Sequence, residues 1–142
     1  MVNELRSMNT KYAFASEDCT DIIQKVCYDR LSNSFVGFCP PLQNNGFPRL
    51  FPFKIESFSD LEDKFRTEML SSSLNIYAIQ PIISDGQRSS PFLLSAFGTD
   101  NSFDSYDLLN RWLKIFDESL RRGVRIVDFA TDCDHDTYVL CV

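Results

Sequence analysis

Gly123-Val-Arg-Ile-Val-Asp-Phe-Ala-Thr-Asp-Cys-Asp-His-Asp136 is the segment from which the topology of this chain follows. Its β-branched and apolar residues predict a strand over 124–131. Three alternating carboxylates come directly after this strand: Asp132, Asp134 and Asp136. Carboxylate oxygens are ligands that hard cations such as Mg²⁺ prefer. The end of the strand is therefore a candidate metal site.

A long amphipathic helix precedes this strand. Apolar residues recur at three- to four-residue spacing through 108–120, which is typical of a helix with one buried face. Two aspartates in the first turn suit the helix dipole, as do Arg121 and Arg122 in the last turn, and Gly123 is a C-terminal stop. We therefore predict a helix over about 104–122 whose two arginines form a solvated end, in preference to a contact with DNA phosphates.

Four shorter apolar runs come before the helix and predict strands: residues 11–18, 34–39, 74–83 and 91–97. The first run alternates with period two, so that Tyr12, Phe14, Ser16 and Asp18 share one side. Proline cannot donate to a strand ladder. We therefore expect the second run to end at Pro40, and we expect Pro81 to place the third run at a sheet edge or a bend.

One shorter helix is predicted between these strands. Ser59-Asp-Leu-Glu62 fits a capping box, and apolar residues follow at four-residue spacing up to Met69. These features predict a helix over about 60–71. Residues 43–52 and 84–90 are rich in turn-forming residues and predict loops.

The order of these elements predicts an α/β fold with an RNase H-like mixed sheet. Such a sheet consists of a three-strand antiparallel meander, a crossover helix, and a fourth strand that returns parallel to the first. A right-handed crossover would set the fourth strand beside the first. Asp18 and Asp132 would then face one another and hold Mg²⁺ or Mn²⁺ ions, which orient and activate the oxygens of a phosphodiester.

Composition indicates a single intracellular domain. The chain has 142 residues, 44% of them hydrophobic, which suits one core. A net charge of −6 without a run of four basic residues argues against an independent nucleic-acid-binding module. The five cysteines are odd in number and lack CxxC spacing, so we expect reduced thiols. No signal-like or membrane-spanning apolar run is present, and no small-molecule substrate is evident.

Several short motifs, taken together, resemble a known family. They are Asp18-Cys-Thr-Asp-Ile-Ile-Gln-Lys-Val-Cys-Tyr-Asp29, Val36-Gly-Phe38, Pro91-Phe-Leu-Leu94 and the strand that leads from Gly123 to Asp132. In their order and spacing they resemble the catalytic core of P-element and THAP-domain transposases over about residues 12–134. The closer likeness is to uncharacterised, transposon-derived proteins of invertebrates.

This resemblance implies metal-dependent DNA cleavage and strand transfer in the nucleus. It implies that Asp18 is the first catalytic carboxylate and Asp132 the second, both ligands of a divalent metal ion. Asp21 is the alternative for the first acid, and Asp134 is the alternative for the second and a further candidate metal ligand.

The chain departs from the family pattern at its C-terminal end. Cys133 stands where the family has glycine, residues 137–142 do not resemble the helix that should follow, and the third acid would come after Val142. We therefore expect residues 1–142 to be one domain with a short N-terminal tail, an incomplete copy that is inactive alone, with homo-oligomerisation as a further option. The alternative is a non-catalytic intracellular interaction or assembly module.

Other interpretations of the acidic cluster have specific weaknesses. The three acids match positions one, three and five of a calcium loop, but Thr137 stands at position six in place of glycine. The Asp132-Cys-Asp134 pair resembles a haloacid-dehalogenase motif, which opens its domain rather than ending it. A zinc site would need ligands without the usual cysteine spacing: Cys39, Cys133, His135 and Cys141. The simplest alternative is a polar loop, with Asp18 or Asp21 capping a turn.

Overall fold

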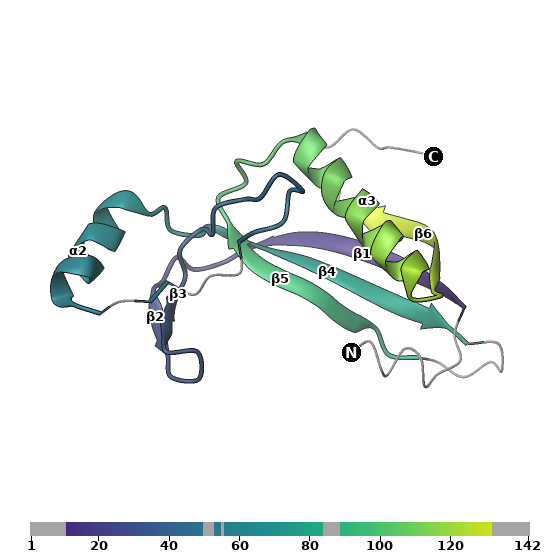
Figure 1. Ribbon diagram of the computed structural model, residues 1–142, viewed down its shortest axis with the longest axis horizontal. Coiled ribbons are helices and arrows are strands. Elements are labelled where there is room, and N and C mark those ends of the chain that lie inside the picture. The colour runs from purple at the N-terminus through teal and green to yellow at the C-terminus, as the bar shows by residue number, and fades with distance from the viewer. Residues whose placement is uncertain (1–10, 50–52, 55, 84–88, 132–142) are drawn as a thin grey trace.

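The computed structural model describes residues 11–49, 53–54, 56–83 and 89–131. Its centre is a four-stranded sheet with the order β5-β4-β1-β6 (Figure 1). The strands are β1 (Tyr12–Asp21), β4 (Ser73–Ile82), β5 (Phe92–Thr99) and β6 (Arg125–Thr131). β4 is antiparallel to both β1 and β5, whereas β6 is parallel to β1. The predicted α/β class is confirmed, and so is the expectation that the last strand lies beside the first.

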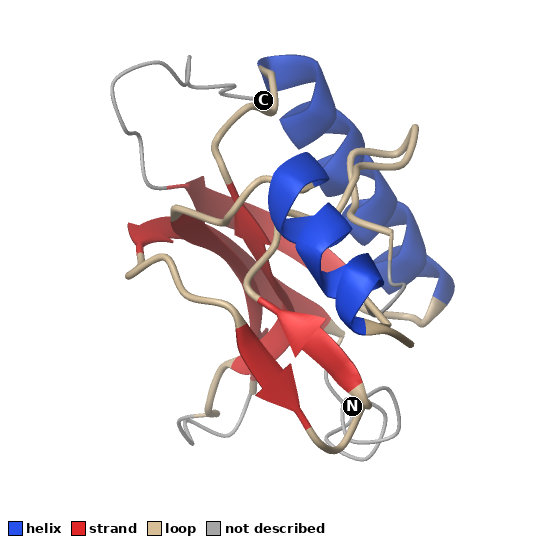
Figure 2. Cartoon of the chain, turned by 90° about the vertical axis from the view of Figure 1, so that its left-hand side faces the viewer, coloured by secondary structure: helices blue, strands red, loops and turns tan. Residues whose placement is uncertain are grey.

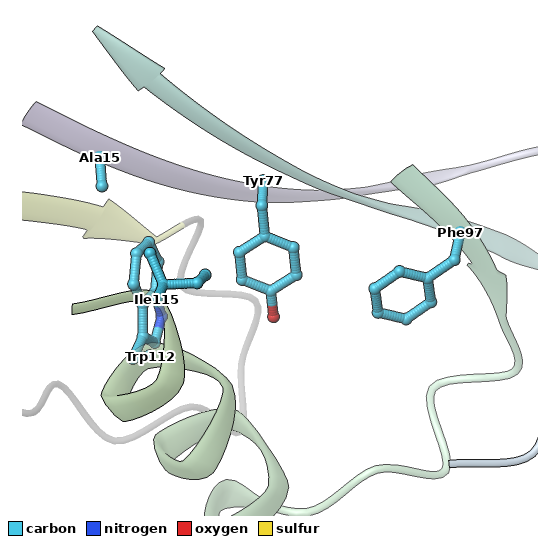
Figure 3. Packing of buried hydrophobic residues seen from close by; sticks show 5 residues of the cluster. All are labelled: Ala15, Tyr77, Phe97, Trp112 and Ile115. Carbon is cyan, nitrogen blue, oxygen red and sulfur yellow. The ribbon is translucent and has the colours of Figure 1, made fainter. Parts of the chain in front are cut away.

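The helix α3 (Ser105–Arg121) covers one face of this sheet (Figure 2). Ala13 and Ala15 of β1 face the helix and are buried, and alanine leaves room there for larger side chains. Tyr77 and Phe97 point from the strands toward Trp112 and Ile115 of the helix (Figure 3). The rings of Tyr77 and Trp112 lie 5.5 Å apart in an edge-to-face arrangement, a geometry that aromatic pairs prefer.

The predicted strand over 34–39 does not enter the main sheet. Only β3 (Ser34–Val36) is extended, and it pairs with β2 (Cys27–Asp29) in a separate hairpin. The Asp29 carboxylate accepts hydrogen bonds from the backbone N–H groups of Leu31 and Ser32, which closes the turn locally. This local closure pairs the run with its sequence neighbour instead of with β1.

The expectation that Pro81 places its strand at a sheet edge is wrong. β4 lies between β1 and β5, and Pro81 pairs with Ala13 near the end of β4. The carbonyl of Pro81 accepts a hydrogen bond from the Ser89 hydroxyl, so it points toward the β5 side. The nitrogen of an extended residue faces the same side. Because the β5 pairing stops at Ile79, no N–H is required from Pro81.

The helix predicted over 60–71 corresponds to α2 (Phe58–Thr67), which begins and ends earlier. Its N-cap is Ser57, whose hydroxyl accepts a hydrogen bond from the N–H of Asp60 at 3.1 Å. The Asp60 carboxylate in turn accepts one from the N–H of Glu56. The predicted capping box at Ser59 is therefore wrong, because an equivalent pair of groups two residues earlier starts the helix.

The prediction for α3 is confirmed at both ends. Asp104 is the N-cap and forms a capping box with Asp107. Arg121 and Arg122 pair with acidic residues of the preceding turn, as a solvated helix end does. Gly123 follows with a φ of 82°, and its N–H donates to the carbonyl of Leu120. No helix in the described ranges is long and apolar enough to cross a membrane.

Replacing Gly123 with alanine is expected to lower the free energy of unfolding by about 1 kcal/mol, because a Cβ disfavours the left-handed backbone. A Cβ at this position would meet nothing within 4 Å, so the loss reflects the backbone alone. Gly123→Asn should lose less, because asparagine tolerates this conformation. Urea denaturation measures all three chains, and equal stability of the alanine variant would contradict the assignment.

Candidate functional site

Asp18 lies on the face of the sheet that α3 does not cover. It is exposed, together with Tyr12, Phe14 and Ser16, and it pairs with Ile76 of β4. The side of β1 that the sequence singles out by its aromatic residues is thus the outer side of the strand. A carboxylate in this position is open to solvent and to a cation.

The pairing of β1 with β6 reaches the residue before each predicted metal ligand. In this parallel ladder Glu17 is the partner of Thr131, and these residues immediately precede Asp18 and Asp132 in the chain. A bulge at Val127 resets the register, so that Asp128 faces Phe14. Asp132 and Asp134 themselves lie outside the described residues, as does the rest of the acidic cluster.

The alternative first acid, Asp21, lies on the other face of β1, toward α3. Its carboxylate accepts a hydrogen bond from the Ser73 hydroxyl at 3.1 Å. Asn101 donates from its side-chain amide to the same hydroxyl, also at 3.1 Å, and its amide oxygen accepts from the Cys19 thiol at 3.2 Å. Asp18 and Asp21 therefore belong to different surfaces and cannot replace one another in a site with β6.

A buried acid next to Asp18 escaped the sequence analysis. Glu17 is only 8% exposed, and both of its oxygens accept hydrogen bonds. Oε1 accepts from the Tyr77 hydroxyl at 2.6 Å and from the Asn75 amide at 2.9 Å, and Oε2 accepts from Trp112 Nε1 at 3.2 Å. The period-two pattern of β1 was the available signal, because it places Glu17 on the same side as the two buried alanines.

A buried arginine extends this network. Arg111 of α3 is fully buried, donates through Nε to the carbonyl of Gly46 and through Nη1 to the Tyr77 hydroxyl at 3.4 Å. Its guanidinium also lies 4.4 Å from the ring centre of Phe103, a cation–π contact. The phenol of Tyr77 thus connects a carboxylate to a guanidinium.

The electrostatics of this cluster keep Tyr77 protonated. Burial is the main cause that raises the pKa of Tyr77, and the negative charge of Glu17 raises it further. A protonated phenol can donate to Glu17 and accept from Arg111 at the same time. Within the described part of the chain, Asn75 Oδ1 and Arg111 Nη2 are the buried side-chain atoms without a hydrogen-bond partner.

Glu17 and Asp18 are consecutive in the chain but have different roles. Glu17 uses both oxygens to hold α3 on the sheet, since its donors come from β4 and from the helix. Asp18 is exposed, and its strand neighbour β6 leads to the acidic cluster. No group of three or more histidine, cysteine or acidic side chains that could hold a metal ion occurs among residues 11–49, 53–54, 56–83 and 89–131.

Cys39, the described member of the proposed zinc set, is half-buried and donates to the Ser71 hydroxyl at 3.6 Å. Burial is the main cause that raises the pKa of the Cys39 thiol. The other members, Cys133, His135 and Cys141, lie outside the described residues.

Comparisons with family models, with curated proteins and with solved structures give no significant match to the chain.

Proposed function

We propose that this chain is an RNase H-like domain derived from a transposase catalytic core, with a divalent metal site between Asp18 and Asp132. The observation that carries the proposal is the parallel pairing of β1 with β6 up to Glu17 and Thr131. The same derivation makes DNA the proposed partner and the nucleus the proposed location.

Strand spacing supports a shared site. Neighbouring strands lie about 4.8 Å apart, which is within the roughly 4–6 Å over which charges couple strongly. The proposal requires the pairing to continue by one residue, so that Asp132 becomes the neighbour of Asp18. Two carboxylates at that separation repel one another, and a bound cation relieves the repulsion.

The proposed ligands suit Mg²⁺ or Mn²⁺. Asp18 supplies one exposed carboxylate, and Asp132 and Asp134 are the proposed source of the others. When bound, the metal would orient and activate the attacking and leaving oxygens of a phosphodiester. The task of this chain is to hold the carboxylates in place, and Glu17 serves that task from the opposite face by fixing β1 to β4 and α3.

Titration with Mg²⁺ or Mn²⁺ tests the site through thermal stability. We expect a wild-type chain to be stabilised by about 2.7 kcal/mol at a metal concentration 100 times the dissociation constant. Asp18→Asn and Asp132→Asn should each abolish most of this gain.

Asp21→Asn and Asp128→Asn are the matched controls, because both acids are exposed. Asp21 lies on the other face of β1, and Asp128 lies earlier in β6, opposite Phe14. Both controls should retain the metal effect. A wild-type chain that no metal stabilises would refute the site. A gain that survives Asp18→Asn would place the metal elsewhere. The alternative prediction is a non-catalytic interaction module. In that case we expect that neither Mg²⁺ nor Mn²⁺ stabilises any of these chains.

A further inference from the structure

The face of the sheet that α3 does not cover carries a pocket over β1. Its volume is about 270 Å³, which is below the usual size of a site for a whole cofactor or metabolite. The outward side chains that line it come from three neighbouring strands: Phe14, Ser16, Ala78, Gln80, Asp128 and Ala130. We call it the Phe14 pocket. A pocket of this size suits one side chain of a partner.

The cross-strand register builds the Phe14 pocket. Phe14 pairs with Gln80 of β4 and with Asp128 of β6, so these three residues form one row across the sheet. The next row on the same face consists of small residues: Ser16, Ala78 and Ala130. The small row is therefore the floor of the pocket, and the row of Phe14 is a wall. The bulge at Val127 places the acid in this wall, because an unbroken ladder would pair Phe14 with Val127.

The free polar atoms beside the Phe14 ring are hydrogen-bond acceptors. Asp128 Oδ1 accepts from the N–H of Phe129 at 2.9 Å, and Oδ2 has no partner in the described part of the chain. Gln80 directs its amide nitrogen to the carbonyl of Ser89 at 3.3 Å, which leaves its oxygen as an acceptor. The wall thus combines an aromatic ring that is 47% exposed with a carboxylate that lacks a cation.

An arginine side chain matches this combination of groups. A guanidinium carries five N–H donors and no acceptor. It stacks on aromatic rings and pairs strongly with carboxylates. Because Phe14 and Asp128 are neighbours in one row, the same guanidinium can make both contacts. A nucleobase carries acceptors as well as donors, so it is a poorer match to a wall of acceptors.

The charges around the pocket favour a basic partner. The chain has a net charge of −6, and Asp18 is a second exposed acid on the same face. Arg125 lies on this face opposite Tyr12, but it forms no ion pair with any described residue. The Asp128 carboxylate is therefore available to a cation from outside the chain. Nucleic-acid phosphates would meet repulsion from both acids.

We propose that the Phe14 pocket binds an arginine side chain presented by a basic segment of a partner protein, with the guanidinium stacked on Phe14 and paired with Asp128. The inference does not rest on the metal site. Phe14 and Asp128 precede the proposed ligands Asp18 and Asp132 by four residues each, which is about 13 Å along a strand. It adds a protein partner to the proposed function.

Nuclear magnetic resonance titration of the isotope-labelled full chain, without metal, tests the pocket. The probe is a Gly-Arg-Gly peptide with blocked ends, and it should shift the amide signals of Phe14, Gln80 and Asp128 in a saturable manner. The matching citrulline peptide has the same shape without the charge. It should bind about tenfold more weakly or worse, because the charged hydrogen bonds are lost.

Variants of the pocket assign the two contacts. Asp128→Asn should weaken binding of the arginine peptide about tenfold. Phe14→Leu keeps an apolar side chain but loses the ring, so it should weaken binding about two- to fivefold. Asp21→Asn is the control, because it removes an exposed acid on the other face of β1, and it should bind as the wild type does. Far-UV circular dichroism confirms that each variant folds.

Three results would overturn the proposal. The first is a wild-type chain that does not respond to the arginine peptide or responds equally to the citrulline peptide. The second is equal weakening by Asp128→Asn and Asp21→Asn, which would indicate a general effect of charge. The third is a shift of the same signals by single-stranded oligothymidylate in place of the arginine peptide, which would make the face a base-stacking surface. Asp128→Asn should retain the stabilisation by metal, so failure of the pocket and failure of the metal site are distinguishable.

Discussion

Glu17→Ala is expected to lower the free energy of unfolding by about 3–5 kcal/mol. The substitution removes the acceptor for three buried donors, on Tyr77, Asn75 and Trp112. It also leaves the buried Arg111 without the carboxylate to which Tyr77 connects it. A buried donor that loses its acceptor costs about 1–3 kcal/mol, and the three losses occur in one connected network, so they are not additive.

The chain offers an unusually close control for this variant. Asp18 is the next residue, but it is exposed on the opposite face of β1. Asp18→Ala should therefore change stability by no more than about 0.5 kcal/mol. Glu17→Gln keeps the shape and one oxygen acceptor, and it should give an intermediate loss. Urea denaturation followed by far-UV circular dichroism measures the set. Similar losses in Glu17→Ala and Asp18→Ala would show that the buried network does not stabilise the fold.

Trp112→Ala is expected to cost about 3–5 kcal/mol, the usual range for deleting a buried aromatic side chain. Trp112 is 3% exposed, and its ring centre lies 4.7 Å from Phe129 of β6 and 5.5 Å from Tyr77 of β4. Its indole N–H also donates to Glu17. The substitution therefore leaves a cavity at the point where α3 meets both strands.

Two further variants separate packing from hydrogen bonding at this position. Trp112→Phe retains an aromatic ring but not the N–H donor, so it should lose less than alanine does. Lys114→Ala, two residues further along the same helix, removes only an exposed ion pair with Glu118 and should cost about 0.3–0.5 kcal/mol. Thermal denaturation at a low protein concentration compares them. A loss in Trp112→Ala no larger than that in Lys114→Ala would contradict the assigned core.

The features that were predictable from the sequence depend on local signals. The bounds of α3 follow from its N-cap aspartate, its apolar periodicity and Gly123, all of which lie within the helix or next to it. The start of α2 is local as well, but Ser57 and Ser59 each have an acid three residues later. The sequence therefore offers two candidate N-caps of similar chemistry, and the pattern alone does not distinguish them.

The features that were missed depend on distant residues. Glu17 receives its hydrogen bonds from residues 58, 60 and 95 positions later in the chain. A charged residue in a strand is expected to be exposed unless buried partners for its charge are known. Pro81 was misjudged for a related reason, because the rule against proline in central strands applies only where the neighbouring strand continues.

The same distinction between local signals and distant contacts applies to the candidate site. The element order predicted that the first and last strands would be neighbours, and the β1–β6 ladder confirms it. Which face each acid would occupy depends on the register and on the bulge at Val127. A single inserted residue moves every following side chain to the opposite face of the sheet, and no feature of the β6 sequence predicts the bulge. The pairing of Asp18 with Asp132 stays a prediction.

The central position of β1 has a consequence for the order of folding. Among the described strands β1 is the first, yet both of its neighbours, β4 and β6, come much later in the sequence. β1 can pair with β4 as soon as β4 exists, whereas its pairing with β6 can form only after residues 125–131 exist. Such non-local contacts slow folding. During synthesis, the side of β1 that later pairs with β6 is therefore an open strand edge, and such an edge can associate with other nascent chains.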